Sequence, residues 1–446
     1  MKKLIVILIL LFAGQGWGAT YYVSQNGTGS GCTDPEDPCS ITDYTNGSSP
    51  FNDVAGDTIY CIGTINAAVD GQPGSSSAQH IFRGDPAGYS ACVIDGQDTR
   101  DDVYSLKDYT TIMNITLQNG VQQNLITIAQ RTSCMIDGVT FQGSGNEGAD
   151  LNLVNSVIRN CIFRNNTGSG LVLDAGDNLE IYNNQAYLNG TDGEYNHDGF
   201  DLSGITNLNV YNNISYSNNS DSGSGIDLCG STGVASRNRS YNNDHNGFGL
   251  CGPSGSDASM TLSHSISFGN GVGVWVYGGD DGDNIYLYNL TIVGSANWPL
   301  RIGASTDDAD KQTVTMQNCI ICALTGASHT LYFMSDKSNY VGNYNDFYGG
   351  STALTRYWDG ENNYSYDLTS WKSVTSQDAN SIDDDPLFIS SSDFRLQPAS
   401  PCHNAGTDVD IGYCGAAPEI GRYEMDCGFS VGTGEASVGT GQLGVE

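Results

Sequence analysis

The chain repeats a short pattern in which a turn-forming residue, most often asparagine, precedes a strand-like run of three residues. The repeats begin, with 22 to 29 residues between successive starts, at Asn114, Gly138, Asn160, Asn184, Asn213, Asn238, Ser265, Asn289 and Asn318. A period of this length indicates a solenoid in which each repeat is one structural unit. We therefore predict an all-β fold, a right-handed parallel β-helix of about ten or more coils, with loops absorbing the differences in length.

The third residue after each start is always large. These positions are Leu117, Phe141, Phe163, Tyr187, Tyr216, Tyr241, Phe268, Ile292 and Ile321. Stacked coils place equivalent residues about 4.8 Å apart, so we expect a column of large side chains. The asparagines should form a second column and satisfy turn backbone by hydrogen bonds along the stack. Gln185 and Arg239, just before the large residues, leave it open whether that column faces the core or the solvent.

A second strand-like phrase, with apolar and other residues in alternation, lies between these starts. It recurs as Gly170-Leu-Val-Leu-Asp174, Gly199-Phe-Asp-Leu-Ser203, Gly225-Ile-Asp-Leu-Cys229, Gly247-Phe-Gly-Leu-Cys251, Gly273-Val-Trp-Val-Tyr277 and Pro299-Leu-Arg-Ile-Gly303. Period-2 alternation is typical of a strand with one buried face. The outward positions then align in two columns, Val172, Asp201, Asp227, Gly249, Trp275, Arg301 and Asp174, Ser203, Cys229, Cys251, Tyr277, Gly303.

Charge narrows the choice of partners. The 446 residues include 17 Lys and Arg against 50 Asp and Glu, a formal net charge of -33. A surface of this sign repels nucleic acid and anionic membranes, so we expect neither as a partner. An acidic polysaccharide could approach only if cations bridge the two. The alternative is a solvated acidic exterior with no partner, and in either case we expect a monomer.

The ends of the chain predict export and a flexible tail. Met1-Lys2-Lys3 and the apolar run from Leu4 to Ala13 are typical of a secretory signal peptide, expected at 1–19, and of a bacterial protein that is secreted or on the cell surface. We expect the β-helix at 20–424, with entry cap and first coils at 20–95, regular coils at 96–350 and closure at 351–424. The tail 425–446 repeats Ser-Val-Gly-Thr-Gly and should be flexible. No later segment is long and apolar enough for a membrane helix.

Export permits disulfides among the 13 cysteines. Close spacing suggests three pairs, and alignment of consecutive repeats suggests a fourth. These are Cys32 with Cys39, Cys319 with Cys322, Cys402 with Cys414, and Cys229 with Cys251. An odd count leaves one thiol over, which we assign to Cys427.

Both ends carry a resemblance to a known group. The start, Thr20-Tyr-Tyr-Val-Ser-Gln-Asn-Gly27 followed by Gly56-Asp-Thr-Ile-Tyr60, resembles the entry of secreted pectate-lyase-like β-helix proteins. The end resembles their exit at Trp371, Gln377-Asp-Ala-Asn-Ser-Ile382, Asp385-Pro-Leu-Phe388, Asp393-Phe-Arg-Leu-Gln-Pro398, Asp410-Ile-Gly412 and Glu424. The resemblance covers nearly the whole chain after residue 19 and implies the superfamily fold. That group includes pectate lyases, alginate lyases, uronan epimerases and surface proteins, so the fold does not select an activity.

The outward columns carry the candidate chemistry. Asp201 and Asp227 should lie one coil apart, where two carboxylates repel unless one is protonated or a cation lies between them. Carboxylate oxygens suit Ca²⁺. Trp275 and Tyr277 offer flat surfaces for a sugar ring, and Arg301 offers a planar fork for a carboxylate. The further candidates for substrate binding are Ser203, His197 and His245. The alternative is ordinary: solvated aspartates on strands, turn-capping aspartates at loops and polar histidines in loops.

The phrase His197-Asp-Gly-Phe-Asp-Leu-Ser-Gly204 is similar to a motif of those pectate lyases that use a lysine base. The resemblance implies that Asp198 is a calcium ligand, with Asp221 and Asp227 as its partners one coil later. The lyase hypothesis adds Asp201 from the outward column to this metal site. The lysine of that family would fall at about Ser203, so elimination needs another base, for which we consider Arg301.

Three functions remain open. We predict a Ca²⁺-dependent polyuronate lyase of the pectate or alginate type, or a degenerate relative of one. The alternatives are a non-catalytic surface or adhesion β-helix that binds glycans, and a glycoside hydrolase that uses Asp201 and Asp227.

Overall fold

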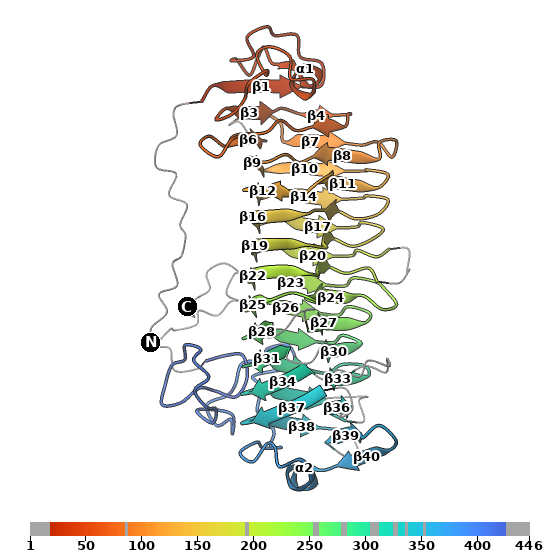
Figure 1. Ribbon diagram of the computed structural model, residues 1–446, viewed down its shortest axis with the longest axis vertical. Coiled ribbons are helices and arrows are strands. Elements are labelled where there is room, and N and C mark those ends of the chain that lie inside the picture. Colours follow the sequence, from red (N-terminus) through yellow and green to blue (C-terminus); the bar gives the residue numbers. More distant parts are fainter. Residues whose placement is uncertain are drawn as a thin grey trace.

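The computed structural model describes residues 18–84, 88–191, 196–252, 258–277, 283–303, 312–323, 329–334, 338–350 and 354–424. The chain winds into a long stack of coils, each contributing one short strand to each of three parallel sheets (Figure 1). This confirms the predicted parallel β-helix. The predicted signal peptide falls outside the described residues except for Gly18 and Ala19, and the predicted tail falls outside them entirely.

Apart from β2, which lies on the outer side of β1, the strands of the described residues run along the stack in the order of the sequence. Sheet A contains β1 (Thr20–Ser24), β2 (Cys39–Ser40), β3 (Thr58–Cys61), β6 (His80–Arg83), β9 (Thr110–Met113), β12 (Arg131–Thr132), β13 (Met135–Asp137), β16 (Leu153–Arg159), β19 (Gly176–Tyr182), β22 (Ile205–Tyr211), β25 (Gly233–Ser236), β28 (Ser259–Ser263), β31 (Asn284–Tyr288), β34 (Gln312–Gln317) and β37 (Ser338–Asn343). Sheet B contains β4 (Thr64–Ile65), β7 (Cys92–Asp95), β10 (Ile115–Gln118), β14 (Thr140–Gln142), β17 (Ile162–Arg164), β20 (Gln185–Tyr187), β23 (Ile214–Tyr216), β26 (Arg239–Tyr241), β29 (Ile266–Phe268), β32 (Thr291–Val293), β35 (Ile320–Ala323) and β38 (Asp346–Gly349). Sheet C contains β5 (Val69–Asp70), β8 (Asp102–Ser105), β11 (Gln123–Ile126), β15 (Ala149–Asp150), β18 (Leu171–Leu173), β21 (Phe200–Leu202), β24 (Ser224–Asp227), β27 (Asn246–Leu250), β30 (Val272–Val276), β33 (Trp298–Ile302), β36 (Leu331–Met334), β39 (Thr355–Trp358) and β40 (Asn363–Tyr366).

Two short helices close the ends of the stack. Helix α1 (Ile41–Thr45) buries Ile41 and Tyr44 over the first coils. At the other end β39 and β40 form an antiparallel hairpin, and α2 (Leu368–Thr375) follows it with Trp371 fully buried. Closure of this kind covers the strand edges through which a parallel stack would pair with another chain. Neither helix of the described residues is long enough to cross a membrane.

The strand register corrects one sequence prediction: the large residues after the repeat starts form two columns. Strand pairing places Phe163 opposite Ala186, and it places Arg164 opposite Tyr187. Phe141 and Phe163 are therefore buried in the core, whereas Tyr187, Tyr216, Tyr241 and Phe268 stack on the outer face of sheet B. In most coils the repeat start is itself the residue with the left-handed turn conformation. In the four coils whose starts run from Asn184 to Ser265, that conformation belongs to the residue before the start. These residues are Asn183, Asn212, Arg237 and His264.

Buried asparagines form two ladders along the stack, one more than predicted. In the predicted ladder, Asn184 donates to Asn213 Oδ1 at 3.0 Å and Asn213 donates to Asn238 Oδ1 at 3.1 Å. The additional ladder runs through Asn166, Asn189, Asn218, Asn243 and Asn270. Each amide also bonds turn backbone, so the ladders satisfy groups that would otherwise be buried without partners.

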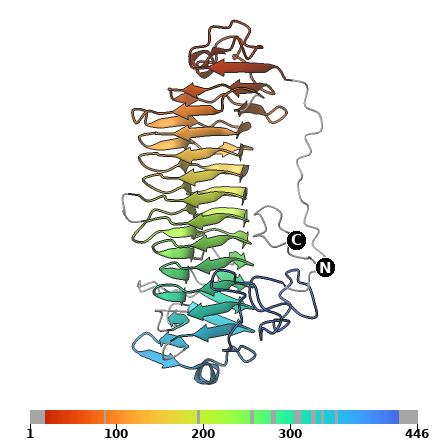
Figure 2. The ribbon, with the colours of Figure 1, turned by 180° about the vertical axis from the view of Figure 1, so that it is seen from behind.

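Residues after α2 return along the outside of the stack instead of capping its end. This segment lies beside the coils that carry β28, β31 and β34, seen from both sides in Figures 1 and 2. Phe394, Leu396 and Ile420 form a second apolar cluster with the outward residues Ile266 and Ile320 of sheet B. The segment thus covers the part of sheet B that is apolar on its outer face.

The cysteines follow the prediction in part. Disulfides join Cys32 to Cys39 and Cys229 to Cys251 as expected, and a third, unpredicted one joins Cys61 to Cys92. The predicted pairs Cys319 with Cys322 and Cys402 with Cys414 are wrong, because the first three of these are free while Cys414 is disulfide-bonded elsewhere. Among the described residues the free thiols, all buried, are Cys134, Cys161, Cys319, Cys322 and Cys402, so more than one thiol is left over. Cys427, to which the leftover thiol was assigned, lies outside the described residues.

Candidate functional site

The outer face of sheet C carries the predicted column. Parallel pairing aligns Val172 with Asp201, Asp201 with Asp227, Asp227 with Gly249, Gly249 with Trp275, and Trp275 with Arg301. Flanking apolar residues such as Phe200, Leu202 and Ile226 point into the core. Alternation therefore forces the residues between them outward.

Asp198 joins this column from the entry of β21. Its side chain is buried, and its Oδ1 accepts a hydrogen bond from the backbone N–H of Ser224 on the next coil. Its own N–H donates to Ser169 Oγ at 2.9 Å on the preceding coil. Bonds to both neighbouring coils fix the carboxylate at the edge of the sheet, next to the outward aspartates.

Asp198, Asp201 and Asp227 form a carboxylate triad, each offering an oxygen within 4.8 Å of the others. One oxygen of each is committed to the fold. Asp201 Oδ1 accepts the Ser203 hydroxyl proton at 2.5 Å, Asp227 Oδ1 accepts the Cys229 N–H at 3.0 Å, and Asp198 Oδ1 accepts the Ser224 N–H. The second oxygen of each has no hydrogen-bond donor among the described residues. The triad therefore offers three oxygens to a ligand.

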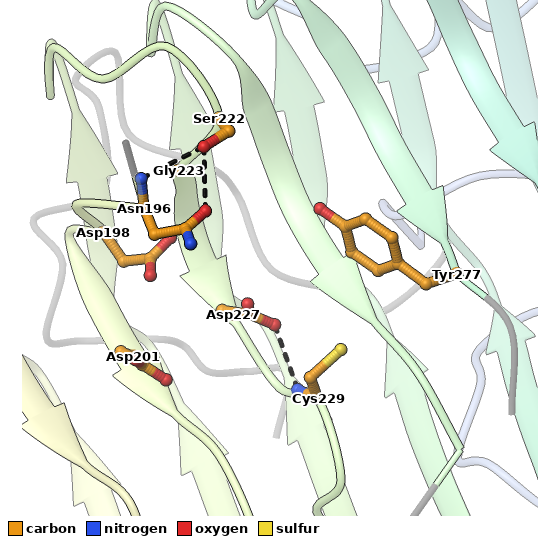
Figure 3. Close-up of a pocket in the computed structure, with 8 residues that line it drawn as sticks. All are labelled: Asn196, Asp198, Asp201, Ser222, Gly223, Asp227, Cys229 and Tyr277. Carbon is orange, nitrogen blue, oxygen red and sulfur yellow. Dashed lines mark hydrogen bonds between the residues drawn. The ribbon is translucent and has the colours of Figure 1, made fainter. Parts of the chain in front are cut away.

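The triad lines a cavity of about 290 Å³ on the outer face of sheet C (Figure 3). The remaining lining residues are Asn196, Ser222, Gly223, Cys229 and Tyr277. Asn196 and Ser222 hydrogen-bond to each other across two coils at 2.8 Å. Tyr277 lies on the opposite side from Asn196, and its hydroxyl accepts a hydrogen bond from Asn246 Nδ2 at 2.7 Å.

Burial and mutual repulsion disfavour the state in which all three carboxyl groups of the triad are ionised. Burial, followed by the charges of Asp227 and Asp201, raises the pKa of Asp198 well above its usual range. Burial likewise raises the pKa of Asp227, and it raises the pKa of Asp201 to about 7. At neutral pH the site must therefore hold protons or a cation, and carboxylate oxygens are the ligands that hard divalent cations prefer.

Gly249 keeps the column open beside the triad. A Cβ at this position would lie 2.7 Å from Ser224 Oγ and 3.0 Å from Asp227 Oδ1. A side chain here would displace the Asp227 carboxylate. Glycine therefore leaves a gap in the outward column between Asp227 and Trp275.

Beyond that gap the column becomes aromatic and cationic. The Arg301 guanidinium lies 3.9 Å from the Trp275 ring centroid, 5.6 Å from that of Trp298 and 5.7 Å from that of Tyr332. The register continues from Arg301 to Tyr332 and Arg356. Three of these residues, Trp298, Tyr332 and Arg356, were not among the predicted site residues. The phrases that could be aligned by counting residues along the sequence end at Gly303, so these three residues were not assigned to the column.

The other predicted residues divide between these two regions. Ser203 holds Asp201 in place through its hydroxyl. The His197 N–H donates to Ser220 Oγ at 3.1 Å, next to the triad. His245 lies against Trp275, with 5.8 Å between ring centroids, and burial followed by the Arg301 charge lowers its pKa. Asp221 is exposed and is not part of the triad; its charge acts on His245.

Comparison with known proteins supports the handedness of the fold. The family model described as "Right handed beta helix region" matches residues 103–234, so the chain is a right-handed parallel β-helix. No curated protein matches the sequence. Similar solved structures include a pectate lyase, with 17% identity over 92% of this chain and 98% of that one and a TM-score of 0.45.

Two further structures show the range of proteins with this shape. The A-module of a mannuronan C-5 epimerase from Azotobacter vinelandii has 16% identity over 77% of this chain and 88% of that one, with a TM-score of 0.41. A surface adhesin of Streptococcus pneumoniae has 11% identity over 73% of this chain and 93% of that one, also with a TM-score of 0.41. A fold does not select an activity, so the chemistry has to be argued from the residues of this chain.

Proposed function

We propose that this protein binds an acidic polysaccharide of the pectate or alginate type through Ca²⁺ held by Asp198, Asp201 and Asp227, and that it cleaves this polysaccharide by elimination. The observation that carries the proposal is the carboxylate triad, in which each residue offers one oxygen within 4.8 Å of those of the other two. A protein of net charge -33 needs such a cation to attract a polyanion. The three disulfides of the described residues suit the oxidising, extracellular location that this substrate implies.

The donor set fits a hard cation. Carboxylate oxygens come from two successive coils, and Ca²⁺ accepts oxygen ligands in flexible geometry together with water and substrate oxygens. When bound, the ion would neutralise a uronate carboxylate and make the neighbouring carbon-bound proton more acidic.

The remaining residues would bind and orient the sugar chain. Arg301 lies three strands from Asp227, roughly 14 Å at about 4.8 Å per strand. At that separation its fork suits the carboxylate of another sugar unit, with Trp275 and Trp298 as flat apolar surfaces beside it. Arg301 therefore takes a binding role in this proposal, in place of the base considered from the sequence.

Tyr277 is the residue of the cavity best placed for proton transfer. Its side chain lies across the cavity from Asn196 and near Asp227 (Figure 3). Burial, followed by the charge of Asp227, raises its pKa, so its hydroxyl keeps its proton at neutral pH. A protonated hydroxyl can donate to the oxygen that leaves in an elimination. The proton that leaves the sugar carbon would pass to His245, because burial lowers the pKa of this ring and keeps it neutral, and its neighbour Asn246 bonds the Tyr277 hydroxyl. No lysine is among the described residues that line the cavity.

The test is incubation with pectate and with alginate, reading ultraviolet absorbance of unsaturated sugar ends with Ca²⁺ or with EDTA. We expect absorbance to rise with Ca²⁺ and to be abolished by EDTA, by Asp198→Ala and by Tyr277→Phe. Asp244→Asn, at an exposed turn, serves as the matched control. Ca²⁺-dependent binding without absorbance would refute elimination and leave a glycan-binding adhesion protein. If both binding and the rise in absorbance persisted in EDTA, the cation site would be refuted.

One observation favours a glycoside hydrolase as a second candidate. Burial raises the pKa of Asp201 to about 7, so a large share of this group keeps its proton near neutral pH, beside the carboxyl group of Asp227. An acid of this kind paired with a nearby carboxylate is the arrangement of glycosidases, and close spacing favours retention of configuration. This candidate predicts new reducing ends without unsaturated ones, and activity that survives EDTA.

A further inference from the structure

A cluster of three arginines lies at the corner between sheets A and B, where the C-terminal segment crosses the stack. We infer that Arg237, Arg239 and Arg422 form an anion-binding site, separate from the carboxylate triad, for an oxyanion such as sulfate, phosphate or the acidic group of a sugar. The inference does not depend on the proposed function. It starts from the charges that the fold brings together.

The three side chains come from two distant parts of the sequence. Arg237 occupies the left-handed turn after β25, and Arg239 is the first residue of β26. Arg422 reaches the same place from the C-terminal segment, where its guanidinium donates to the Arg237 carbonyl at 3.4 Å. The backbone of Arg422 is held there because its N–H donates to Thr291 Oγ1 at 3.0 Å.

Within the part of the chain that the structure describes, none of these arginines has a carboxylate partner. The chain has 50 Asp and Glu against 17 Lys and Arg, so an arginine meets an acid far more easily than another base. Elsewhere that happens, as with Arg159 and Asp137 at 2.8 Å and with Arg395 and Asp393 at 2.5 Å. Among the described residues, no ion pair involves Arg237, Arg239 or Arg422.

Buried donors in the cluster lack acceptors. The Nε atoms of Arg237 and Arg239 are both shielded from solvent, and neither has a hydrogen-bond partner. Buried N–H groups of guanidinium are costly without an acceptor, and a bound oxyanion would supply one to each. The aromatic rings of Tyr241 and Phe268, with centroids 4.9 and 5.1 Å from the Arg239 guanidinium carbon, fix the direction of that fork.

The neighbouring histidine reports the same uncompensated positive charge. His264 follows Arg237 one coil along the stack, at the same left-handed turn position. Burial, followed by the charges of Arg422 and Arg237, lowers the pKa of His264 to about 4. Burial is the main cause that lowers the pKa of Arg422. Tyr423 opposes it, and the charges of Arg239 and Arg237 add smaller contributions that lower the pKa further. A bound anion would relieve all of these repulsions at once.

The geometry suggests how the anion acts on the fold. The anion would join Arg237 and Arg239 of the regular coils to Arg422 of the C-terminal segment. The site lies at the turn between β25 and β26, away from the outer face of sheet C. Binding would therefore stabilise the attachment of residues 377–424 to the stack. An anion at 100 times its Kd shifts the folding equilibrium by about 100-fold.

The experiment measures the melting temperature of the full chain in sodium sulfate and in sodium chloride at equal ionic strength, with EDTA present. We expect sulfate to raise it above chloride in the wild type and in Arg83→Gln, but not in Arg239→Gln or Arg422→Gln. Arg83 is the matched control, because it also lies over a tyrosine ring, 5.2 Å from that of Tyr60, but belongs to no cluster. Arg422→Lys should keep part of the effect, since it keeps the charge and loses the fork.

A second arm separates a free ion from a sugar-borne anion. This arm measures the binding of dextran sulfate, with neutral dextran as the reference. If the acidic group of a polysaccharide occupies the site, the affinity for dextran sulfate should fall more than about tenfold in Arg239→Gln. If only inorganic sulfate and phosphate bind, the site takes free anions. Sulfate also stabilises proteins generally by exclusion from their surface. An equal rise in the wild type and all four variants would therefore overturn the proposal, and so would no rise in any of them.

Discussion

Replacing Asp201 by asparagine should remove much of the pH dependence of stability that the carboxylate triad imposes. Burial raises the pKa of Asp201 from 3.8 to about 7, while the Ser203 hydrogen bond opposes the shift and the charges of Asp227 and Asp174 add to it. Between these two pH values the folded protein holds a proton that the unfolded chain has released. Stability from this group is thus complete below pH 3.8 and is lost as the pH rises to about 7.

The size of the effect follows from the size of the shift. Each unit of pKa corresponds to about 1.4 kcal/mol, so a shift of about three units corresponds to an upper value of about 4 kcal/mol. The pKa values of Asp198 and Asp227 are raised in the same direction, so part of the pH dependence will remain in the variant. We expect Asp201→Asn to be more stable than the wild type by about 1–3 kcal/mol at pH 7.5 in EDTA.

Urea unfolding between pH 4 and pH 8 in EDTA measures this directly. The wild-type midpoint should fall across the range, and that of Asp201→Asn should fall less. With Ca²⁺ added, the wild type should recover more than the variant, because the variant has lost a charged ligand. Asp244→Asn, at an exposed turn, should follow the wild type. Equal slopes for the wild type and Asp201→Asn would refute the assignment of repulsion to this triad.

Three further outcomes are expected. Trp275→Ala should weaken polyuronate binding by about tenfold, measured by titration calorimetry, because a ring under a guanidinium contributes about 1–2 kcal/mol; unchanged affinity would exclude Trp275 from the binding surface. Asn218→Ala should destabilise the fold by about 2–3 kcal/mol in urea, since two donors of Asn189 lose their acceptor, whereas the exposed Asn219→Ala should cost under about 0.5 kcal/mol. Burial lowers the pKa of His80 to about 4, so stability should be lost as the pH falls from 6.5 to about 4. Hydrogen exchange should then accelerate first at Tyr44, whose hydroxyl bonds His80 at 2.9 Å, and an acid response that starts elsewhere would contradict this.

The part of the site on sheet C could be predicted because its sequence pattern leaves little freedom. An entry residue that is glycine in every phrase but the last, where it is Pro299, is followed by two inward apolar residues with one outward residue between them. This phrase recurs without insertion, so counting residues gives the register directly. Asp201, Asp227, Trp275 and Arg301 were aligned on that basis, and strand pairing places them as predicted.

The column on sheet B could not be predicted in the same way, because adjacent asparagines made two registers equally acceptable. Asn183 and Asn184 both suit a turn, yet only Asn183 adopts the left-handed conformation and Asn184 is buried in the ladder. A shift of one residue reverses the face of a strand, which is why Tyr187 lies outside while Phe163 lies inside. The arginine cluster was also out of reach, since the segment that delivers Arg422 has no period to count.

Because the strands of sheet C stack in strict register, a whole coil can be gained or lost in evolution without disturbing the remaining coils. The loops that join β21, β24, β27, β30 and β33 can lengthen or shorten without altering which outward residues are neighbours, since pairing alone sets the column. Gain or loss of one whole coil between Asp227 and Arg301, by contrast, would move the cationic fork by a single strand spacing. If the proposed function holds, such a change would fit the carboxylate triad to polymers of a different repeat length while every residue at both ends of the proposed binding surface stays the same.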